Sequence, residues 1–155
     1  MNKTLKSLLI ETPLGPMHAA ADGEALWHLE FDSQLDIPEG RNPILTSIEK
    51  ELKAYFAKKL TRFETPLKLH GTPFQERVWQ ELREIPYGET RSYVEIADRI
   101  GHSRAYRAVG NANGCNALMI IIPCHRVIAA DGSLGGYGCG LDRKQFLLDL
   151  ERKTR

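Results

Sequence analysis

The chain has 155 residues, of which 42% are hydrophobic and 26% are charged, and its formal net charge is +1. That length is enough for one good core or for two small lobes, and the composition is that of an ordinary folded protein, which excludes fibrous and disordered classes. The longest apolar run is far too short to span a bilayer, and Glu11 and Pro13 interrupt the N-terminal apolar stretch before it resembles a signal peptide, so we expect a cytoplasmic protein without membrane contact.

The first 70 residues are expected to form a small lobe of strands followed by a helix. Residues 8–12, 17–21 and 25–31 have the composition of short strands, and Gly15 and the pair Asp22-Gly23 separate them as turn residues do. Residues 43–59 then carry apolar side chains at helical spacing, beginning with a proline. Residues 64–71 are interpreted as the link to a second lobe.

The next part of the chain predicts three short helices. Thr72 is a suitable N-cap for a helix that stops before Pro86. Residues 92–100 predict a second helix that Gly101 ends, and Ser103 is expected to cap a third helix that reaches about residue 113. Two short helices joined in this way have the spacing of a helix-turn-helix.

The last third of the chain predicts a buried strand, a loop and a closing helix. The apolar run 119–122 suits a strand that Pro123 terminates, and five glycines make residues 130–140 a loop. Residues 141–151 predict a helix whose inner face carries Phe146, Leu147 and Leu150. The expected fold class is therefore α+β, with a sheet-plus-helix lobe at 1–70 and a mainly helical lobe at 71–155 that contains the helix-turn-helix and Cys124.

Charge is unevenly distributed along the second lobe. From Arg99 to Ala130 there is no Asp or Glu, whereas the same stretch holds four arginines, Arg104 and Arg107 among them, and two histidines. A local basic patch binds phosphates even in a protein that is neutral as a whole. DNA binding is one interpretation of this hairpin, and an ordinary helical hairpin with a chance cluster of charge is the other.

Cys124 is the candidate for chemistry. It follows Pro123 and precedes His125 and Arg126, and a nearby base or cation raises the thiolate fraction of a cysteine. A lone cysteine is otherwise more often a small buried hydrophobic residue. Adjacent side chains in an extended segment point to opposite faces, so a direct bond between thiol and imidazole requires a turn or a bridging water. A carboxylate should orient the imidazole. The residues alone leave four candidates for it: Asp131, Asp142, Asp149 and Glu151.

The cysteine pattern also limits the alternatives. The three cysteines are an odd number and lie in the C-terminal third, which argues against a disulfide scaffold. No Cys-x-x-Cys pair occurs and the histidines are scattered, so neither a metal nor a cofactor is expected.

Residues 123–127, Pro-Cys-His-Arg-Val, resemble the active-site signature of the O6-alkylguanine-DNA alkyltransferases, also called methylated-DNA–protein-cysteine methyltransferases. The resemblance covers the whole second lobe, in family order, through segments at 71–75, 85–90, 92–93, 107–110 and 143–148. The first lobe is similar mainly in layout, including residues 12–15.

The resemblance implies a role for each residue at the reacting centre. Cys124 would accept the alkyl group, His125 would take its proton through a water, and Glu151 would hold His125. Tyr93 would donate a hydrogen bond or a proton to guanine N3 as the base leaves. Arg107 would replace the flipped nucleotide in the base stack.

The same resemblance implies a DNA surface, a hinge and a base pocket. The DNA surface would include Ser92, Arg104, Arg107, Ala108 and Gly110. Asn116 would be the hinge between the helix-turn-helix and the active-site turn. The pocket would be lined by Met119, Val127, Tyr137 and Gly138. The partner would be duplex DNA carrying O6-alkylguanine, and also O4-alkylthymine, bound through its minor groove by a monomeric protein.

The bond type predicts a single turnover. An alkylated cysteine is a thioether, which has no carbonyl for water to attack, so each molecule would be spent after one reaction. Two other classes remain as alternatives: a non-catalytic protein that only binds alkylated DNA, and a cysteine hydrolase that uses Cys124 and His125 and turns over.

Overall fold

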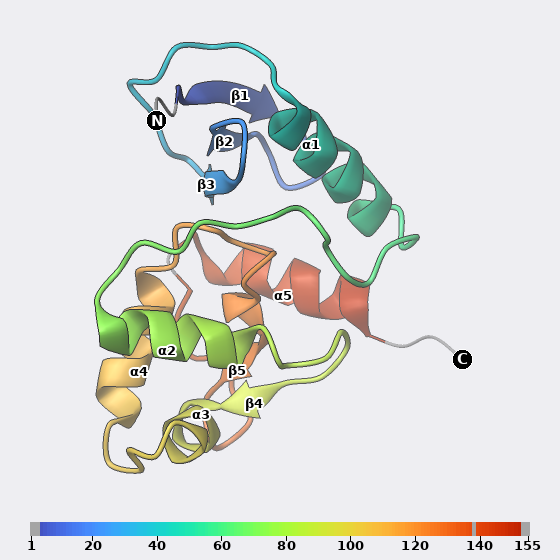
Figure 1. Ribbon diagram of the computed structural model, residues 1–155. Coiled ribbons are helices and arrows are strands. Elements are labelled where there is room, and N and C mark those ends of the chain that lie inside the picture. Colours follow the sequence, from blue (N-terminus) through green and yellow to red (C-terminus); the bar gives the residue numbers. More distant parts are fainter. Residues whose placement is uncertain (1–3, 138, 153–155) are drawn as a thin grey trace. The chain divides into compact units, whose positions relative to one another are not determined.

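The computed structural model describes residues 4–137 and 139–152, and the chain divides into two units, Met1–His70 and Gly71–Arg155 (Figure 1). Each unit has its own secondary structure and buried residues and is described by itself. Within the described residues, no helix has both the length and the apolar character needed to cross a membrane.

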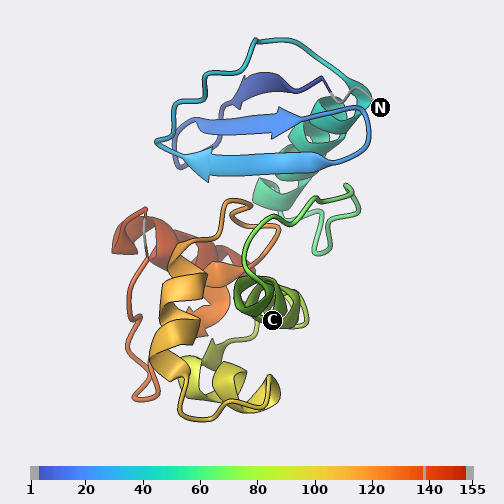
Figure 2. The same ribbon diagram turned by 60° about the vertical axis from the view of Figure 1, so that its left-hand side comes forward.

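The N-terminal unit is a three-stranded antiparallel sheet with one helix. Strands β1 (Lys6–Ile10), β2 (Met17–Ala21) and β3 (Leu26–Phe31) lie in the order β1-β2-β3. Helix α1 (Pro43–Phe56) packs on the sheet (Figure 2). Its N-cap is Asn42, whose Oδ1 accepts from the backbone N–H of Leu45 at 2.9 Å. The helix buries four side chains: Leu45, Ile48, Leu52 and Tyr55.

Three boundaries in this unit differ from those that the sequence predicts. Strand β1 occupies residues 6–10 and not 8–12, because Thr12 and Gly15 form a turn in which the N–H of Gly15 donates to the carbonyl of Thr12. Helix α1 ends at Phe56 and not at residue 59. Lys58 has a φ of 62° there, and the N–H groups of Lys58 and Lys59 bond the carbonyls of Tyr55 and Ala54.

The third difference is in the expected link. Leu67 forms a parallel bridge with Leu26, and the N–H of Lys68 donates to the carbonyl of Leu26 at 2.9 Å. Residues 66–68 therefore extend the edge of the sheet, which no local pattern in the sequence indicated.

The C-terminal unit is built from helices α2 (Pro73–Leu82), α3 (Tyr93–Arg99), α4 (Tyr106–Gly114) and α5 (Leu141–Glu151). Helices α2 and α3 both begin with a capping box, formed by Thr72 with Gln75 and by Ser92 with Glu95. Helices α3 and α4 pack together as the helix-turn-helix, and both pack against α2. The fold class that the sequence predicts is thus confirmed.

Two details of the helices correct the sequence-based expectation. Ser103 does not cap α4, which starts at Tyr106 with no side-chain cap, because the N–H of Ala105 donates to the carbonyl of His102 and residues 102–105 form a turn. Phe146 of α5 is 39% exposed, while the buried positions are Lys144, Leu147 and Glu151. Of the predicted inner face, Leu147 is buried and Leu150 is half-buried, so only Phe146 was placed wrongly, and two of the three buried residues are charged ones that hydrophobicity does not indicate.

Residues 119–122 are buried as expected, but they do not form a strand. The chain reverses there: the N–H of Ile122 donates to the carbonyl of Leu118 at 3.0 Å, and Ile120 has a φ of 74°. A β-branched residue is rarely found in the left-handed region, so the surroundings must hold this turn in place.

Candidate active site

Cys124 lies in a short 3-10 turn, Cys124–Arg126, between the buried reversal and strand β5 (Val127–Ile128). Strand β5 pairs in parallel with β4 (Arg91–Ser92), whose last residue is the N-cap of α3. The cysteine turn is thereby fastened to the start of the helix-turn-helix. Cys124 itself is only 2% exposed.

Two asparagine side chains fix the backbone around Cys124. Asn116 donates from Nδ2 to the carbonyl of Ile122 at 2.8 Å, and its Oδ1 accepts from the N–H of Leu118 at 2.8 Å. Asn113, on α4, donates from Nδ2 to the carbonyl of Cys124 at 3.3 Å. Asn113 was not among the predicted site residues, although it ties α4 to the cysteine directly.

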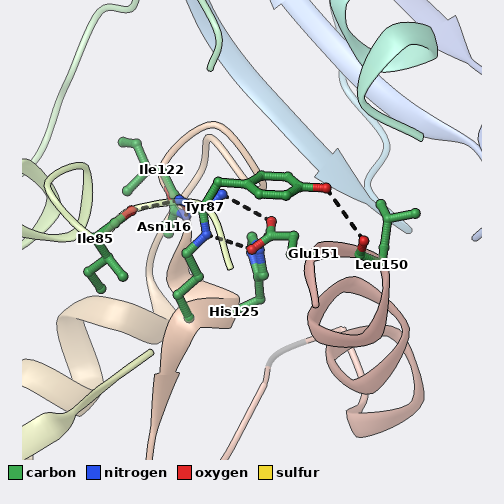
Figure 3. A network of polar contacts seen from close by, with 8 residues as sticks. Ile85, Tyr87, Asn116, Ile122, His125, Leu150 and Glu151 are labelled. Carbon is green, nitrogen blue, oxygen red and sulfur yellow. Dashed lines mark hydrogen bonds and ion pairs between the residues drawn. The ribbon is translucent and has the colours of Figure 1, made fainter. Parts of the chain in front are cut away.

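His125 forms a buried pair with Glu151 at the end of α5. Its Nε2 lies 2.7 Å from Oε2 of Glu151, and the two side chains are 0% and 1% exposed. Figure 3 shows the imidazole of His125 and the carboxylate of Glu151 pointing toward one another, beside Tyr87. Of the four carboxylates that the sequence left open, only Glu151 is seen bonded to the imidazole, since Asp131 accepts from Ser133 and Asp149 pairs with Arg152.

Burial controls the protonation of this cluster. It raises the pKa of Cys124 to about 11, against the opposing effects of a hydrogen bond from Asn116 and the charge of Lys144. Burial also lowers the pKa of His125, while the carboxylate of Glu151 acts to raise it. At neutral pH the resting pair is consequently a neutral thiol and a neutral imidazole.

Tyr93, the first residue of α3, lies between the helix-turn-helix and the glycine-rich loop. A Cβ on Gly135 would come within 3.0 Å of the Tyr93 hydroxyl, and one on Gly110 would lie 3.8 Å from its ring. Gly135 also has a φ of 72°, so a side chain there would be strained as well as crowded. Burial raises the pKa of Tyr93, against a hydrogen bond with the backbone of Gly136, and keeps its hydroxyl protonated as a donor.

Lys144 is a second residue that the sequence-based prediction missed. It is 0% exposed, and its Nζ donates to the carbonyls of Val127 at 2.6 Å and Gly136 at 3.0 Å. These bonds hold the glycine-rich loop against β5. Burial lowers the pKa of Lys144 to about 8, while the Cys124 thiol acts to raise it. A signal existed in the sequence: Lys144 stands seven residues before Glu151, two turns away on the same face of the helix.

The predicted pocket residues gather around the same turn. Val127 is fully buried and Met119 is 4% exposed, with its Sδ 3.4 Å from Sγ of Cys139. Tyr137 is half-buried, and its pKa is raised by burial and by the nearby Cys124. Gly138 lies outside the described residues.

The predicted DNA-contacting residues lie on the helix-turn-helix. Arg104, Arg107 and Ala108 are exposed, whereas Ser92 and Gly110 are half-buried. The basic stretch is not one surface, however. Arg126 is 7% exposed and bonded to Glu151, and Arg99 pairs with Glu81 at 3.5 Å. The arrangement is a buried thiol next to an imidazole–carboxylate pair, carried in the same unit as a helix-turn-helix.

Comparison with known proteins agrees with this arrangement along the chain. Residues 5–69 match the family model described as "6-O-methylguanine DNA methyltransferase, ribonuclease-like domain", and residues 73–153 match its "DNA binding domain". A methylated-DNA–protein-cysteine methyltransferase of Methanosarcina barkeri is 50% identical over 152 residues, which is 94% of this chain and 96% of that protein.

Solved structures extend the similarity to three dimensions. The OGT protein of Mycobacterium tuberculosis in complex with DNA is 47% identical, with a TM-score of 0.88 over 96% of this chain and 92% of that one. An O6-methylguanine DNA methyltransferase of Methanococcus jannaschii is 32% identical, with a TM-score of 0.68 over 96% and 95%. The chain belongs to the 6-O-methylguanine DNA methyltransferase family.

Proposed function

We propose that this protein repairs DNA by transferring the alkyl group of O6-alkylguanine, and of O4-alkylthymine, irreversibly to Cys124. The observation that carries the proposal is the buried His125–Glu151 pair at 2.7 Å, next to Cys124 in the unit that holds the helix-turn-helix. Family membership and the likeness to an OGT structure in complex with DNA support it further. In this proposal residues 71–155 bind DNA and carry the chemistry, and residues 1–70 have a structural role.

In the proposed reaction the thiol of Cys124 loses its proton as it attacks. His125 takes the proton through a bridging water, while Glu151 holds the imidazole. The sulfur forms a bond to the alkyl carbon, and the bond from that carbon to O6 of guanine breaks. Tyr93 donates to N3 of the departing base, a task that suits a hydroxyl whose pKa is raised by burial.

The base must leave the duplex to reach a cysteine that is 2% exposed. We propose that α4 enters the minor groove, where Ala108 and Gly110 permit close approach and Arg107 fills the gap in the stack. Arg104 and Ser92 would contact the backbone. Exposure of Arg104, Arg107 and Ala108 supports this assignment.

The flipped base would enter a pocket that the hinge and the loop complete. In this proposal Asn116 is the hinge, and Met119, Val127, Tyr137 and Gly138 line the pocket. We further propose that the protein acts as a monomer in the cytoplasm.

The test is a count of transferred groups. The protein is incubated with duplex DNA that carries labelled O6-methylguanine in excess over the protein, and the amount of label transferred per protein chain is measured. The proposal predicts a plateau at one label per chain, on Cys124, and none for Cys124→Ala. Cys115→Ala is the matched control, since Cys115 is exposed, and it should reach the same plateau. Continued turnover would favour a hydrolase, and DNA binding without transfer would favour a non-catalytic binding protein; either result would overturn the proposal.

A further inference from the structure

The carboxylate of Glu151 serves two partners that are both able to carry positive charge. Besides His125, it is bonded by Arg126, whose Nε lies 2.8 Å from Oε1 and whose Nη2 lies 3.0 Å from Oε2. All three side chains are buried: their exposed fractions are 0%, 7% and 1% for His125, Arg126 and Glu151. One negative charge can balance only one of the two cations.

Arg126 is the cation that Glu151 balances, because a guanidinium does not lose its proton in proteins. A proton on His125 would then add an uncompensated positive charge to the cluster. Among the described residues, the charged and titratable groups near His125 are Cys124 and Arg126 from its own turn and Lys144 and Glu151 from α5, with Tyr87 from the segment before β4 beside the carboxylate. Within this described set, Arg126 and Lys144 are cations and Glu151 is the anion.

The hydrogen bonds of the imidazole also indicate that His125 is neutral. A carboxylate only accepts, so Nε2 of His125 is the donor toward Glu151. Nδ1 is buried and has no hydrogen-bond partner among the described residues. In a neutral ring that atom is a lone-pair acceptor. In an imidazolium that atom would be an N–H donor and could no longer accept the proton of Cys124.

Arg126 is itself held by groups other than Glu151. Its Nη1 donates to the carbonyl of Ile85 at 2.7 Å, and its guanidinium lies 5.7 Å from the centre of the Tyr87 ring. Tyr87 in turn donates from its hydroxyl to the carbonyl of Leu150 at 3.4 Å (Figure 3). The guanidinium is therefore fixed beside the carboxylate whatever the state of His125.

We infer that Arg126 is a positioning residue of the alkyl transfer. It neutralises the charge of Glu151, so that Glu151 orients His125 without stabilising its protonated form, and Nδ1 of His125 stays available for the proton of Cys124. This inference rests on the proposed function. With Arg126 beside it, Glu151 can orient the imidazole while the imidazole stays neutral, which a carboxylate without a cation partner cannot do.

The test is the pH dependence of single-turnover alkyl transfer between pH 5 and 9. In the wild type the rate should fall on the acid side only as His125 becomes protonated. In Arg126→Met the unbalanced carboxylate should bind an imidazolium, and the acid limb should move up by about one to three pH units. At a pH below both limbs the rate should thus fall about tenfold, relative to wild type, for each pH unit by which the limb moves, and most of the loss should be recovered at the alkaline end.

Two further variants separate charge from structure. Arg126→Lys keeps a cation and should leave the limb close to its wild-type position. Arg41→Met removes an arginine from an exposed pair with Glu49, and its profile should match that of the wild type. If Arg126 serves only as an anchor for Ile85 and Tyr87, Arg126→Met will lower the rate equally at every pH, and the inference is wrong.

A measurement on the unaltered protein guards against a variant that does not fold. The ring nitrogens of His125 are observed by nitrogen NMR in wild-type protein at pH 7. We expect a neutral ring with its proton on Nε2, and an imidazolium would overturn the inference. Absence of transfer by the wild type at every pH would instead overturn the proposed function. Transfer with an unmoved acid limb in Arg126→Met would refute the role of Arg126 alone.

Discussion

Replacing Asn116 by Ala should destabilise the C-terminal unit more than a change of one small side chain normally does. The amide of Asn116 makes two hydrogen bonds across the reversal that precedes Cys124, one to the carbonyl of Ile122 and one from the N–H of Leu118, both 2.8 Å long. Asn116 is 5% exposed, so water cannot easily take its place. Between the two bonds lies Ile120, with a φ of 74° that an isoleucine does not adopt unaided.

The magnitude follows from the groups left behind. Each buried donor or acceptor that loses its partner costs about 1–3 kcal/mol, and the two losses together give about 2–6 kcal/mol. For a chain of this size, 1 kcal/mol corresponds to a change in Tm of about 2–4 °C, so Asn116→Ala should lower Tm by roughly 4–24 °C.

Urea unfolding followed by tryptophan fluorescence measures this loss. In a Trp27→Phe background the remaining Trp79, which is 5% exposed, reports on the C-terminal unit alone. Asn111→Ala is the matched control, because Asn111 is exposed on α4 and its loss should change the unfolding free energy by less than about 0.5 kcal/mol. A loss below about 1 kcal/mol for Asn116→Ala would refute the view that this side chain holds the turn.

Three further predictions concern capping, acid and thiol chemistry. Ser92→Ala removes the cap that accepts from the N–H of Glu95 at 3.1 Å and should cost about 1 kcal/mol in urea unfolding, whereas Ser133→Ala in the exposed loop should cost less. Burial lowers the pKa of His125, and, although burial raises that of Glu151, bonds from His125 and Arg126 lower it well below its ordinary range. The folded state therefore binds fewer protons than the unfolded chain, and the unfolding free energy should fall as the pH drops below about 6.5 and more steeply below about 4.5; an unfolding free energy that is flat from pH 7 to 4 would contradict this. Finally, a small thiol reagent at pH 7 should modify exposed Cys115 at least tenfold faster than Cys124, whose pKa burial raises to about 11, as peptide mapping by mass spectrometry would measure.

Features set by neighbours in the sequence were predicted well. The cap at Thr72, the end of a helix at Gly101 and the spacing of the helix-turn-helix depend on a few adjacent residues, and the structure contains them. The reversal at 119–122 was missed because it depends on the amide of Asn116 and on its own burial, while its apolar composition equally suits a strand.

In the candidate site, too, features set by adjacent residues were predictable and features set by tertiary contacts were not. Cys124 and His125 are adjacent in the sequence, so their proximity in the site was open to prediction from the residues. The carboxylate was not, because four acidic residues follow and only tertiary structure brings Glu151 to 2.7 Å from His125. Lys144 was missed, and Arg126 was predicted only as a cation near the thiol, because a charged residue is normally expected to be exposed. Each of the two is buried by partners that are distant in the sequence or on the backbone.

The burial of Cys124 has a consequence for a protein that reacts once. A thioether product is permanent, so any reaction with a stray electrophile would consume the molecule. A thiol that is 2% exposed and whose pKa is about 11 is almost fully protonated at neutral pH and presents little nucleophile to the solvent. In the proposed reaction the proton moves to His125 when a substrate is in place, which requires an imidazole that is neutral beforehand. Under this proposal, burial of the thiol and charge balance at Glu151 serve one requirement: the cysteine stays inert until a base occupies the proposed pocket, and then loses its proton without help from bulk water.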